Sequence, residues 1–310
     1  MQAHKIALAI HGGAGTILKS SMTAVKEKAY QSALKIALEQ GYQVLANGGS
    51  ALDAVEVAVC YLEDSPLFNA GRGSVFSAEG KHEMDASIME GQKLMAGAVC
   101  SVECLANPVR LARRVMEKSE HVMLANKGAE QFAREQGFEF EKAAYFHDEY
   151  RYQQWQALRG SDKFQLDHSS KKDEKFGTVG AVALDSMGNL AAATSTGGMT
   201  NKKYGRIGDS PIIGAGTYAN NTTAAISCTG SGEFFIRGVV AYDVSCLIEY
   251  KGLSLKNACR EVVHQRLQKI GGDGGLIAVD TQGNIVLDFN TEGMYRGWKT
   301  PQDYGIEIYK

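Results

Sequence analysis

The spacing of apolar residues in the first part of the chain predicts mainly helices. Between Thr23 and Ala46 apolar residues recur at three- and four-residue intervals, and the glycine pair after Asn47 ends the pattern. Ser50 then has the character of an N-cap residue, with Asp53 three residues on as in a capping box. The elements predicted in this part are strands at 5–10 and 96–102 and helices at 23–46, 50–62, 108–116 and 127–136.

The second part of the chain combines hairpins with helices. Val179–Leu184 and Leu190–Thr194 flank the turn-forming run Asp185–Asn189, which predicts a hairpin. The remaining predicted elements are a strand at 224–229, helices at 234–250 and 255–270, and a hairpin of 276–279 with 285–289. Hairpins and helices in runs argue against a doubly wound parallel fold. We therefore predict an α+β fold in which two antiparallel sheets pack face to face, with helices outside.

A polar stretch separates these two parts. From Gly137 onward aromatic and charged residues mix, and the run from Asp167 to Lys175 has no apolar face. Such a run cannot bury enough apolar surface to order itself, so we predict a mobile connector over about 137–177. The chain shows no internal repeat, and we treat residues 1–310 as one domain.

Composition excludes several classes of partner. The 310 residues are 44% hydrophobic and 22% charged, as in ordinary globular proteins. A formal net charge of -2 and a pI near 6.4 make nucleic acid and an anionic membrane surface poor partners. No stretch approaches the roughly 18 apolar residues of a membrane helix. The first residues also lack the pattern of a signal peptide.

Cysteine and histidine usage bears on compartment and metals. The six cysteines are sparse and form no CxxC pair, which favours buried thiols in a reducing compartment, and we predict the cytoplasm. The seven histidines show no HExxH or similar spacing, and no phosphate-binding glycine motif occurs. We therefore expect no catalytic metal or cofactor.

The junction between the polar stretch and the following strand is the best candidate for chemistry. There the chain runs through Gly177 and Thr178 into an apolar strand. A threonine is a weak nucleophile unless a base stands beside it, and its own α-amine can serve as that base once it becomes an N-terminus. The unperturbed amine pKa of about 7.7–8.0 leaves a sizeable neutral fraction near neutrality. On these residues alone, Gly177 could equally be a loop glycine entering a strand.

Six ordered motifs carry a resemblance that decides between these interpretations. They are HGGAG (11–15), NAGRGSVF (69–76), MDASIMEG (84–91), the stretch from GTVGAVALD to GTYANN (177–221), CTGSGEFFIR (228–237) and FNTEGMYRGW (289–298). Together they closely resemble the plant-type (type 2) asparaginase and isoaspartyl-peptidase family of N-terminal-nucleophile hydrolases. The resemblance covers nearly the whole chain except about 137–175. It implies a four-layer αββα sandwich that cuts itself between Gly177 and Thr178. The products would be an α subunit of 1–177 and a β subunit of 178–310, assembled as a dimer of αβ units.

The resemblance also implies a role for individual residues. Thr178 matches the nucleophile, and Thr196 a second threonine that supports it. Thr229 and Gly230 match the oxyanion hole, although a plain strand-to-helix turn would also use such residues. Substrate would be held by Arg206, Asp209, Gly232 and Asn69.

Arg206 and Asp209 suit a substrate that carries both charges. An arginine fork grips a carboxylate, and a carboxylate accepts from an ammonium, so the two would hold an amino-acid end. That places the scissile amide on the substrate side chain. Without the resemblance, the two residues would be read as an ion pair on a surface loop.

A structural sodium ion is the one bound ion that the resemblance implies. The residues that match the family's cation loop would bind it through backbone carbonyls, and they are Leu62, Glu63, Ser65, Phe68, Ala70 and Arg72.

The sequence therefore predicts an isoaspartyl peptidase and L-asparaginase that acts on β-aspartyl dipeptides and asparagine and releases aspartate. One alternative is a glycosylasparaginase, which would do the same chemistry on a glycosylated asparagine. A second, from a different class, is an uncut amino-acid-binding protein without turnover.

Overall fold

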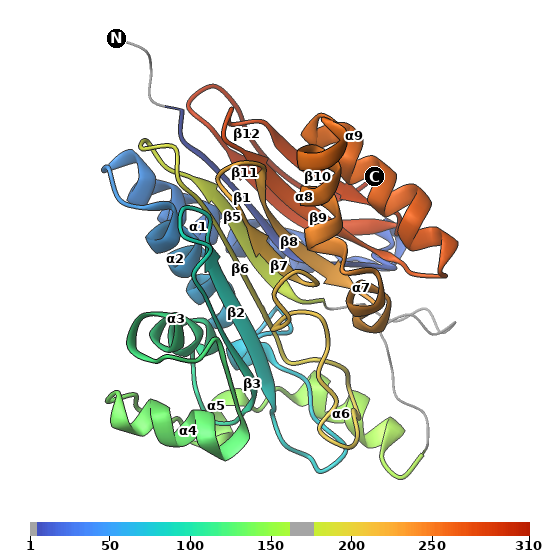
Figure 1. Ribbon diagram of the computed structural model, residues 1–310. Coiled ribbons are helices and arrows are strands. Elements are labelled where there is room, and N and C mark those ends of the chain that lie inside the picture. Colours follow the sequence, from blue (N-terminus) through green and yellow to red (C-terminus); the bar gives the residue numbers. More distant parts are fainter. Residues whose placement is uncertain (1–4, 162–176) are drawn as a thin grey trace.

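Two β-sheets form the centre of the molecule in the computed structural model, which describes residues 5–161 and 177–310 (Figure 1). The larger sheet has eight strands in the order β12-β11-β1-β5-β6-β2-β3-β4. In that order they span Tyr304–Tyr309, Gly293–Lys299, Ala7–Gly15, Val179–Leu184, Leu190–Thr196, Met84–Glu90, Ala96–Val102 and Met123–Ala125. The smaller sheet, β10-β9-β8-β7, comprises Ile285–Phe289, Gly274–Asp280, Ala224–Gly230 and Thr217–Ala219. All neighbouring strands are antiparallel except β3 and β4.

Helices cover the outer face of each sheet. Against the larger sheet lie α1 (Ala24–Ala46), α2 (Ala51–Glu63), α3 (Pro108–Lys118) and α4 (Asn126–Glu135). Against the smaller sheet lie α7 (Gly232–Gly238), α8 (Val240–Lys251), α9 (Leu255–Glu261) and the π-helical η3 (Val262–Leu267). Between the sheets is a third core rich in alanine and small aliphatic residues. The predicted αββα sandwich is thus confirmed, with the two helical layers on opposite sides of the molecule in Figure 1.

The first strand is longer than its apolar run predicted. β1 continues through the glycine-rich stretch to Gly15, and the register against β11 shifts between His11 and Gly13. Gly13 has a φ of +110°, which a side chain would strain. The glycines after residue 10 thus form a bulge inside a central strand, which bends the strand where the site lies.

Two predicted helices are interrupted. The helix expected over 234–250 divides at Val239, whose φ of +47° is left-handed and separates α7 from α8. The helix expected over 255–270 begins as α9 and widens into η3. Strands β2, β4, β7, β11 and β12 were not predicted. β2 is buried on both faces, β4 and β7 have three residues each, and β11 and β12 mix glycine, aromatic and charged residues.

The first part of the predicted connector, which was expected to begin at about residue 137, is folded. Helices α5 (Ala143–Phe146) and α6 (Glu149–Leu158) follow α4, and Phe146 and Trp155 are buried. The Trp155 ring stacks on Phe76 with centroids 5.6 Å apart. The prediction is therefore wrong for the part up to Leu158, since this aromatic packing orders it. Asp167–Lys175 lies outside the described residues.

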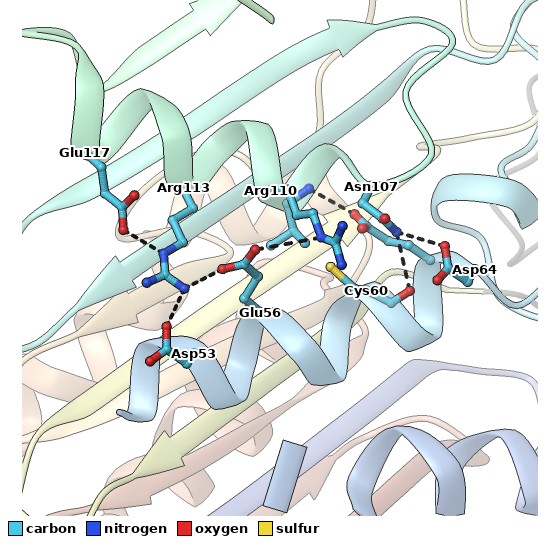
Figure 2. Close-up of polar contacts among 10 residues, drawn as sticks. Asp53, Glu56, Cys60, Asp64, Asn107, Arg110, Arg113 and Glu117 are labelled. Atoms are coloured by element: carbon cyan, nitrogen blue, oxygen red, sulfur yellow. Dashed lines mark hydrogen bonds and ion pairs between the residues drawn. The ribbon is translucent and has the colours of Figure 1, made fainter. Parts of the chain in front are cut away.

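A polar cluster joins α2 to α3 in the outer layer (Figure 2). The Arg113 guanidinium pairs with Asp53 at 2.7 Å, Glu117 at 2.7 Å and Glu56. At the other end of the interface, Asn107 donates to Asp64 at 2.9 Å. Short 3-10 turns, η1 (Lys19–Ser21) and η2 (Gly71–Gly73), complete the described elements. Among all the helices of residues 5–161 and 177–310, none combines the length and hydropathy that crossing a membrane requires.

Candidate active site

Thr178 lies where β5 begins, beside the end of β6. The register that pairs Val179 with Ser195 brings Thr178 next to Thr196. The Thr178 hydroxyl donates to Thr196 Oγ1 at 3.2 Å, and both side chains are buried. Thr196 Oγ1 also accepts from the Gly198 amide at 3.0 Å. With both acceptor sites of Thr196 used, its own proton is available to donate.

Two glycines let the chain before Thr178 pass close to β1. A Cβ on Gly13 would lie 2.5 Å from the Gly177 Cα, and a Cβ on Gly177 would lie 2.6 Å from the Gly13 Cα. Neither distance is compatible with a side chain. The Cβ position of Gly177 is also 3.0 Å from Thr229 Oγ1, so the Gly177–Thr178 bond runs beside that hydroxyl.

Thr229 and Gly230 end β8 on the opposite sheet. Thr229 Oγ1 accepts from the Ala14 amide at 3.3 Å, which leaves its proton free to donate to an oxygen that develops negative charge. Gly230 has a φ of +155°, and a Cβ there would lie 2.4 Å from the Asp273 carbonyl oxygen. Only glycine fits this turn. The structure therefore brings the predicted oxyanion pair to the predicted nucleophile from a segment 51 residues later in the chain.

Arg206 pairs with a residue other than Asp209, so the alternative interpretation of the two as a surface ion pair does not hold. Its guanidinium instead donates to both carboxylate oxygens of Glu233, at 2.8 and 2.9 Å. Glu233 was not identified as a site residue from the sequence. The signal was its place directly after Gly232 in the glycine-rich motif, but nothing there indicated its partner.

Asp209 is a buried carboxyl group with one unsatisfied oxygen. Its side chain is 3% exposed, and Oδ2 has no hydrogen-bond partner among the described residues. Burial raises the pKa of Asp209 to about 7, against the opposing effect of Arg206. A buried carboxylate without a partner is costly, and an ammonium group bound beside it would remove that cost.

Gly232, the first residue of α7, lies against both charged side chains. A Cβ at this position would lie 2.9 Å from Arg206 Nη2 and 2.9 Å from Asp209 Oδ1. Gly232 thus allows both charged groups to approach the helix N-terminus. This arrangement brings three of the four predicted substrate-binding residues together.

Asn69, the fourth predicted substrate-binding residue, supports the turn after Thr196. Its Nδ2 donates to the Gly198 carbonyl at 2.7 Å, and its Oδ1 accepts from the Val75 amide at 3.1 Å. Its carbonyl accepts from the Gly197 amide at 3.0 Å. Both ends of the Asn69 amide are therefore engaged by the protein.

Two buried charged residues near this site, Lys202 and Asp85, were not identified from the sequence. Lys202 is buried, donates to the Glu83 carbonyl at 2.8 Å and lies 3.9 Å from the Glu83 carboxylate. Asp85 is also buried and accepts from the Ser101 amide at 2.8 Å. Burial raises the pKa of Asp85, with Lys202 acting against that rise.

The residues of the predicted sodium site surround two glycines that are closely packed against backbone carbonyl groups. Gly71 has a φ of +51°, and its Cβ position is 2.5 Å from the Glu63 carbonyl oxygen and 2.8 Å from that of Ala106. The Gly73 Cβ position is 2.1 Å from the Phe68 carbonyl oxygen. Carbonyl oxygens therefore lie close to both glycines, and the sodium site on this segment stays a prediction. Of the remaining predicted ligands, Leu62 lies in the last turn of α2, and Ser65 and Ala70 lie in the loop that follows it.

Side chains play little part in that loop. The Arg72 guanidinium lies over the Tyr145 ring at 5.3 Å, so only its carbonyl is a candidate ligand. In the described part of the chain, no three His, Cys, Asp or Glu side chains gather as a metal site.

Comparisons with known proteins agree with this geometry. The family model described as "Asparaginase" matches residues 4–307. The isoaspartyl peptidase of Escherichia coli (strain K12) is 54% identical over 297 residues, which are 95% of this chain and 92% of that protein. The isoaspartyl peptidase/L-asparaginase of Homo sapiens is 43% identical over 303 residues, covering 96% and 94% respectively. A probable isoaspartyl peptidase/L-asparaginase 2 of Arabidopsis thaliana is 41% identical over 319 residues, covering 96% and 97%. The chain therefore belongs to this asparaginase family.

Proposed function

We propose that the protein is a threonine hydrolase that matures by cutting itself before Thr178 and then cleaves side-chain amides of β-aspartyl dipeptides and asparagine. The observation that carries the proposal is the meeting of Thr178, Thr196 and Thr229 beside the Gly177–Thr178 bond. Relatives at 43–54% identity bear the names isoaspartyl peptidase and L-asparaginase, which fits this substrate class.

Maturation would use the nucleophile on its own backbone. The Thr178 hydroxyl attacks the Gly177 carbonyl carbon, and the oxygen of that carbonyl gains negative charge. The C–N bond then breaks, its nitrogen takes up the hydroxyl proton as the new α-amine, and Gly177 is left as an ester on Thr178. Water hydrolyses the ester and frees both ends. The nearby Thr229 hydroxyl is in place to donate to the developing oxyanion.

Turnover would repeat this chemistry on substrate, with the freed amine of Thr178 as base. Arg206, braced by Glu233, would bind the α-carboxylate, and the unsatisfied Asp209 oxygen would accept from the α-ammonium. The side-chain carbonyl then faces Thr178, and Thr229 with Gly230 would stabilise its oxyanion. The amide nitrogen leaves, water clears the acyl-enzyme, and aspartate is released.

Cation, assembly and location form part of the same proposal. A sodium ion on the carbonyls of the 62–72 loop would hold that loop without taking part in chemistry. Two αβ units would pair, for which the exposed Tyr242, Tyr250 and Val239 offer an apolar surface. Six free cysteines fit the cytoplasm. Sedimentation of the mature protein at about twice the chain mass of 33.4 kDa would support the pairing.

Intact mass followed by N-terminal sequencing tests the proposal. We expect two fragments, one beginning Thr-Val-Gly-Ala-Val. Thr178→Ala should give a single chain without activity, and normal turnover by that variant would disprove the proposal. A stable uncut wild-type chain that binds aspartate without turnover would indicate the binding protein instead. Comparing turnover of a β-aspartyl dipeptide with that of a glycosylated asparagine distinguishes the glycosylasparaginase alternative.

A further inference from the structure

A row of polar side chains crosses the otherwise apolar space between the two sheets and begins at Thr178. His11, on β1, is fully buried. Its Nδ1 lies 3.0 Å from the Thr178 carbonyl oxygen, and its Nε2 lies 2.9 Å from Ser227 Oγ. The row continues through Thr194 on β6, 2.7 Å from Ser227 Oγ, and Thr217 on β7, 2.5 Å from Thr194 Oγ1.

The direction of every hydrogen bond in this row follows from its first member. A carbonyl oxygen only accepts, so His11 Nδ1 carries the proton. Burial lowers the pKa of His11 to about 3, although the bond to Thr178 acts against it, so the ring is neutral and Nε2 accepts. Ser227 therefore donates to His11. Since each hydroxyl has one proton, Thr194 donates to Ser227 and Thr217 donates to Thr194. These contacts are shorter than the competing ones, of Ser227 with the Ala193 carbonyl and of Thr194 with the Gly216 carbonyl, both at 3.2 Å.

The far end of the row returns to the same threonine. Ser87 Oγ has one proton and two acceptors within reach, Thr217 Oγ1 at 2.7 Å and the Ser210 carbonyl oxygen at 2.6 Å, so the one-way run of donors ends at Thr217. The Ser210 hydroxyl lies 3.4 Å from Thr178 Oγ1. The row thus reaches the carbonyl of Thr178, and Ser210, next to its far end, lies close to the hydroxyl of the same residue.

Burying these polar side chains in an apolar layer costs free energy unless each is hydrogen-bonded. Small aliphatic residues fill the rest of the space between the sheets, and partly satisfied polar groups there would destabilise the fold. Gly180 adds a second constraint, because a Cβ there would lie 2.0 Å from Ser227 Oγ and 2.4 Å from His11 Nε2. Apolar side chains of the same shape would pack equally well at these positions, so packing does not explain why hydroxyl groups occur there.

We propose that His11, with Ser227, Thr194 and Thr217 behind it, is a positioning residue that fixes the Thr178 backbone and so aims the nucleophilic hydroxyl and its amine. The inference rests on the proposed function. Fixing the carbonyl of Thr178 restricts rotation of that residue. A network that points one way cannot switch the His11 tautomer, so the carbonyl always has its donor.

Isosteric substitutions test the role without changing shape. Thr194→Val removes one hydroxyl of the row, and Thr194→Ser restores it. We expect Thr194→Val to lower both the rate of cleavage at Gly177 and the kcat for a β-aspartyl dipeptide about tenfold, the factor expected for one hydrogen bond felt in the transition state. KM should stay within about twofold, because Arg206 and Asp209 are untouched. Thr194→Ser should recover most of kcat.

The matched control is Thr223→Val. Thr223 is also buried and its hydroxyl lies 2.7 Å from that of Ser245, but this pair is not part of the row. It should leave kcat unchanged. The inference fails if Thr194→Val keeps wild-type kcat, or if it changes stability and KM while kcat stays. Should Thr194→Val not fold, Thr217→Val with Thr217→Ser decides by the same criteria. If the wild-type protein itself neither cuts nor turns over, the proposed function has failed rather than this inference.

Discussion

At the scale of single residues, the Asp209 carboxyl group has the environment that best suits the binding of an ammonium group. The fold holds this carboxyl group out of water beside Arg206 and gives one oxygen no partner in the described structure. Its pKa, raised to about 7 by burial, means that it is only partly charged near neutrality. A bound ammonium group would favour the charged form, so substrate binding and ionisation of Asp209 are coupled.

Aspartate binding should therefore weaken as the pH falls. The ionised fraction of Asp209 changes from about nine-tenths at pH 8 to about one-tenth at pH 6, so the inhibition constant of aspartate should rise about tenfold over that range. The sign follows because the ammonium requires the deprotonated form. Inhibition of dipeptide hydrolysis by aspartate, measured across this range, checks it.

Asp209→Asn is the control for this titration. It should bind aspartate weakly with little change between pH 8 and pH 6. Titration of the freed Thr178 amine is common to both proteins, so the difference between their profiles isolates Asp209. Parallel profiles for the two proteins would show that Asp209 does not hold the ammonium.

A single methyl group at Gly232 should disturb substrate binding. The added Cβ of Gly232→Ala would meet Arg206 Nη2 and Asp209 Oδ1, each at 2.9 Å, and would displace one of them. We expect KM to rise about tenfold or more, with a smaller change in kcat. Gly128→Ala, in α4 with open space around its Cβ, should leave the kinetics unchanged. An unaltered KM in Gly232→Ala would contradict the assigned binding site.

How much of this site was predictable depended on where each partner lies in the chain. Motifs identified Thr178, Thr196 and Thr229, whose residue types stand out beside glycines. Glu233 and His11 were missed as partners because their contacts, Arg206 and Ser227, lie 27 and 216 residues away. One sequence does not show how the strands pair, so contacts between such distant residues cannot be predicted from it.

At the scale of elements, the sequence predicted those helices and strands that depend on turn and capping residues close by in the chain. The hairpin of β5 and β6 and the Ser50-capped α2 follow from turn and capping residues, and both were confirmed. The break at Val239 and the strand β2 depend on tertiary packing. Val239 takes up a left-handed conformation that no β-branched residue prefers by itself, so its sequence predicted a continuous helix.

The α2–α3 contact should depend on Arg113 more than on its neighbour Arg110. The Arg113 side chain is 22% exposed and pairs with three carboxylates, whereas that of Arg110 is 58% exposed and lies 3.9 Å from Glu56. Arg113→Met leaves partly buried acidic groups unpaired, so its Tm should fall by a few degrees.

Arg110→Met is the matched control and should change Tm by less, because exposed pairs contribute little. Both variants should keep wild-type kcat, since the cluster lies in the outer helical layer (Figure 2). Differential scanning calorimetry and dipeptide kinetics measure both effects. Equal Tm values for the two variants would show that Arg113 does not join the helices.

At the scale of the whole molecule, the larger sheet interleaves strands from both sides of the proposed cut. β1, from the first segment, pairs with β11 and β5 of the second segment. β6, from the second, pairs with β2 of the first. The smaller sheet then packs against β1 from across the interior. The core under its own helices lies within the second segment, but the core between the sheets and the core of the larger sheet both need residues from each segment.

Cleavage at Gly177 should therefore leave one folded particle. Separating the segments would break the β1–β11, β1–β5 and β2–β6 ladders together and expose the apolar core between the sheets, so we expect a single cooperative unfolding transition. The two fragments should co-elute in native size-exclusion chromatography and separate only in denaturant. As the control, uncut Thr178→Ala should elute at the same native volume. Separation of the wild-type fragments in plain buffer would mean that the two segments fold independently, which this strand order forbids.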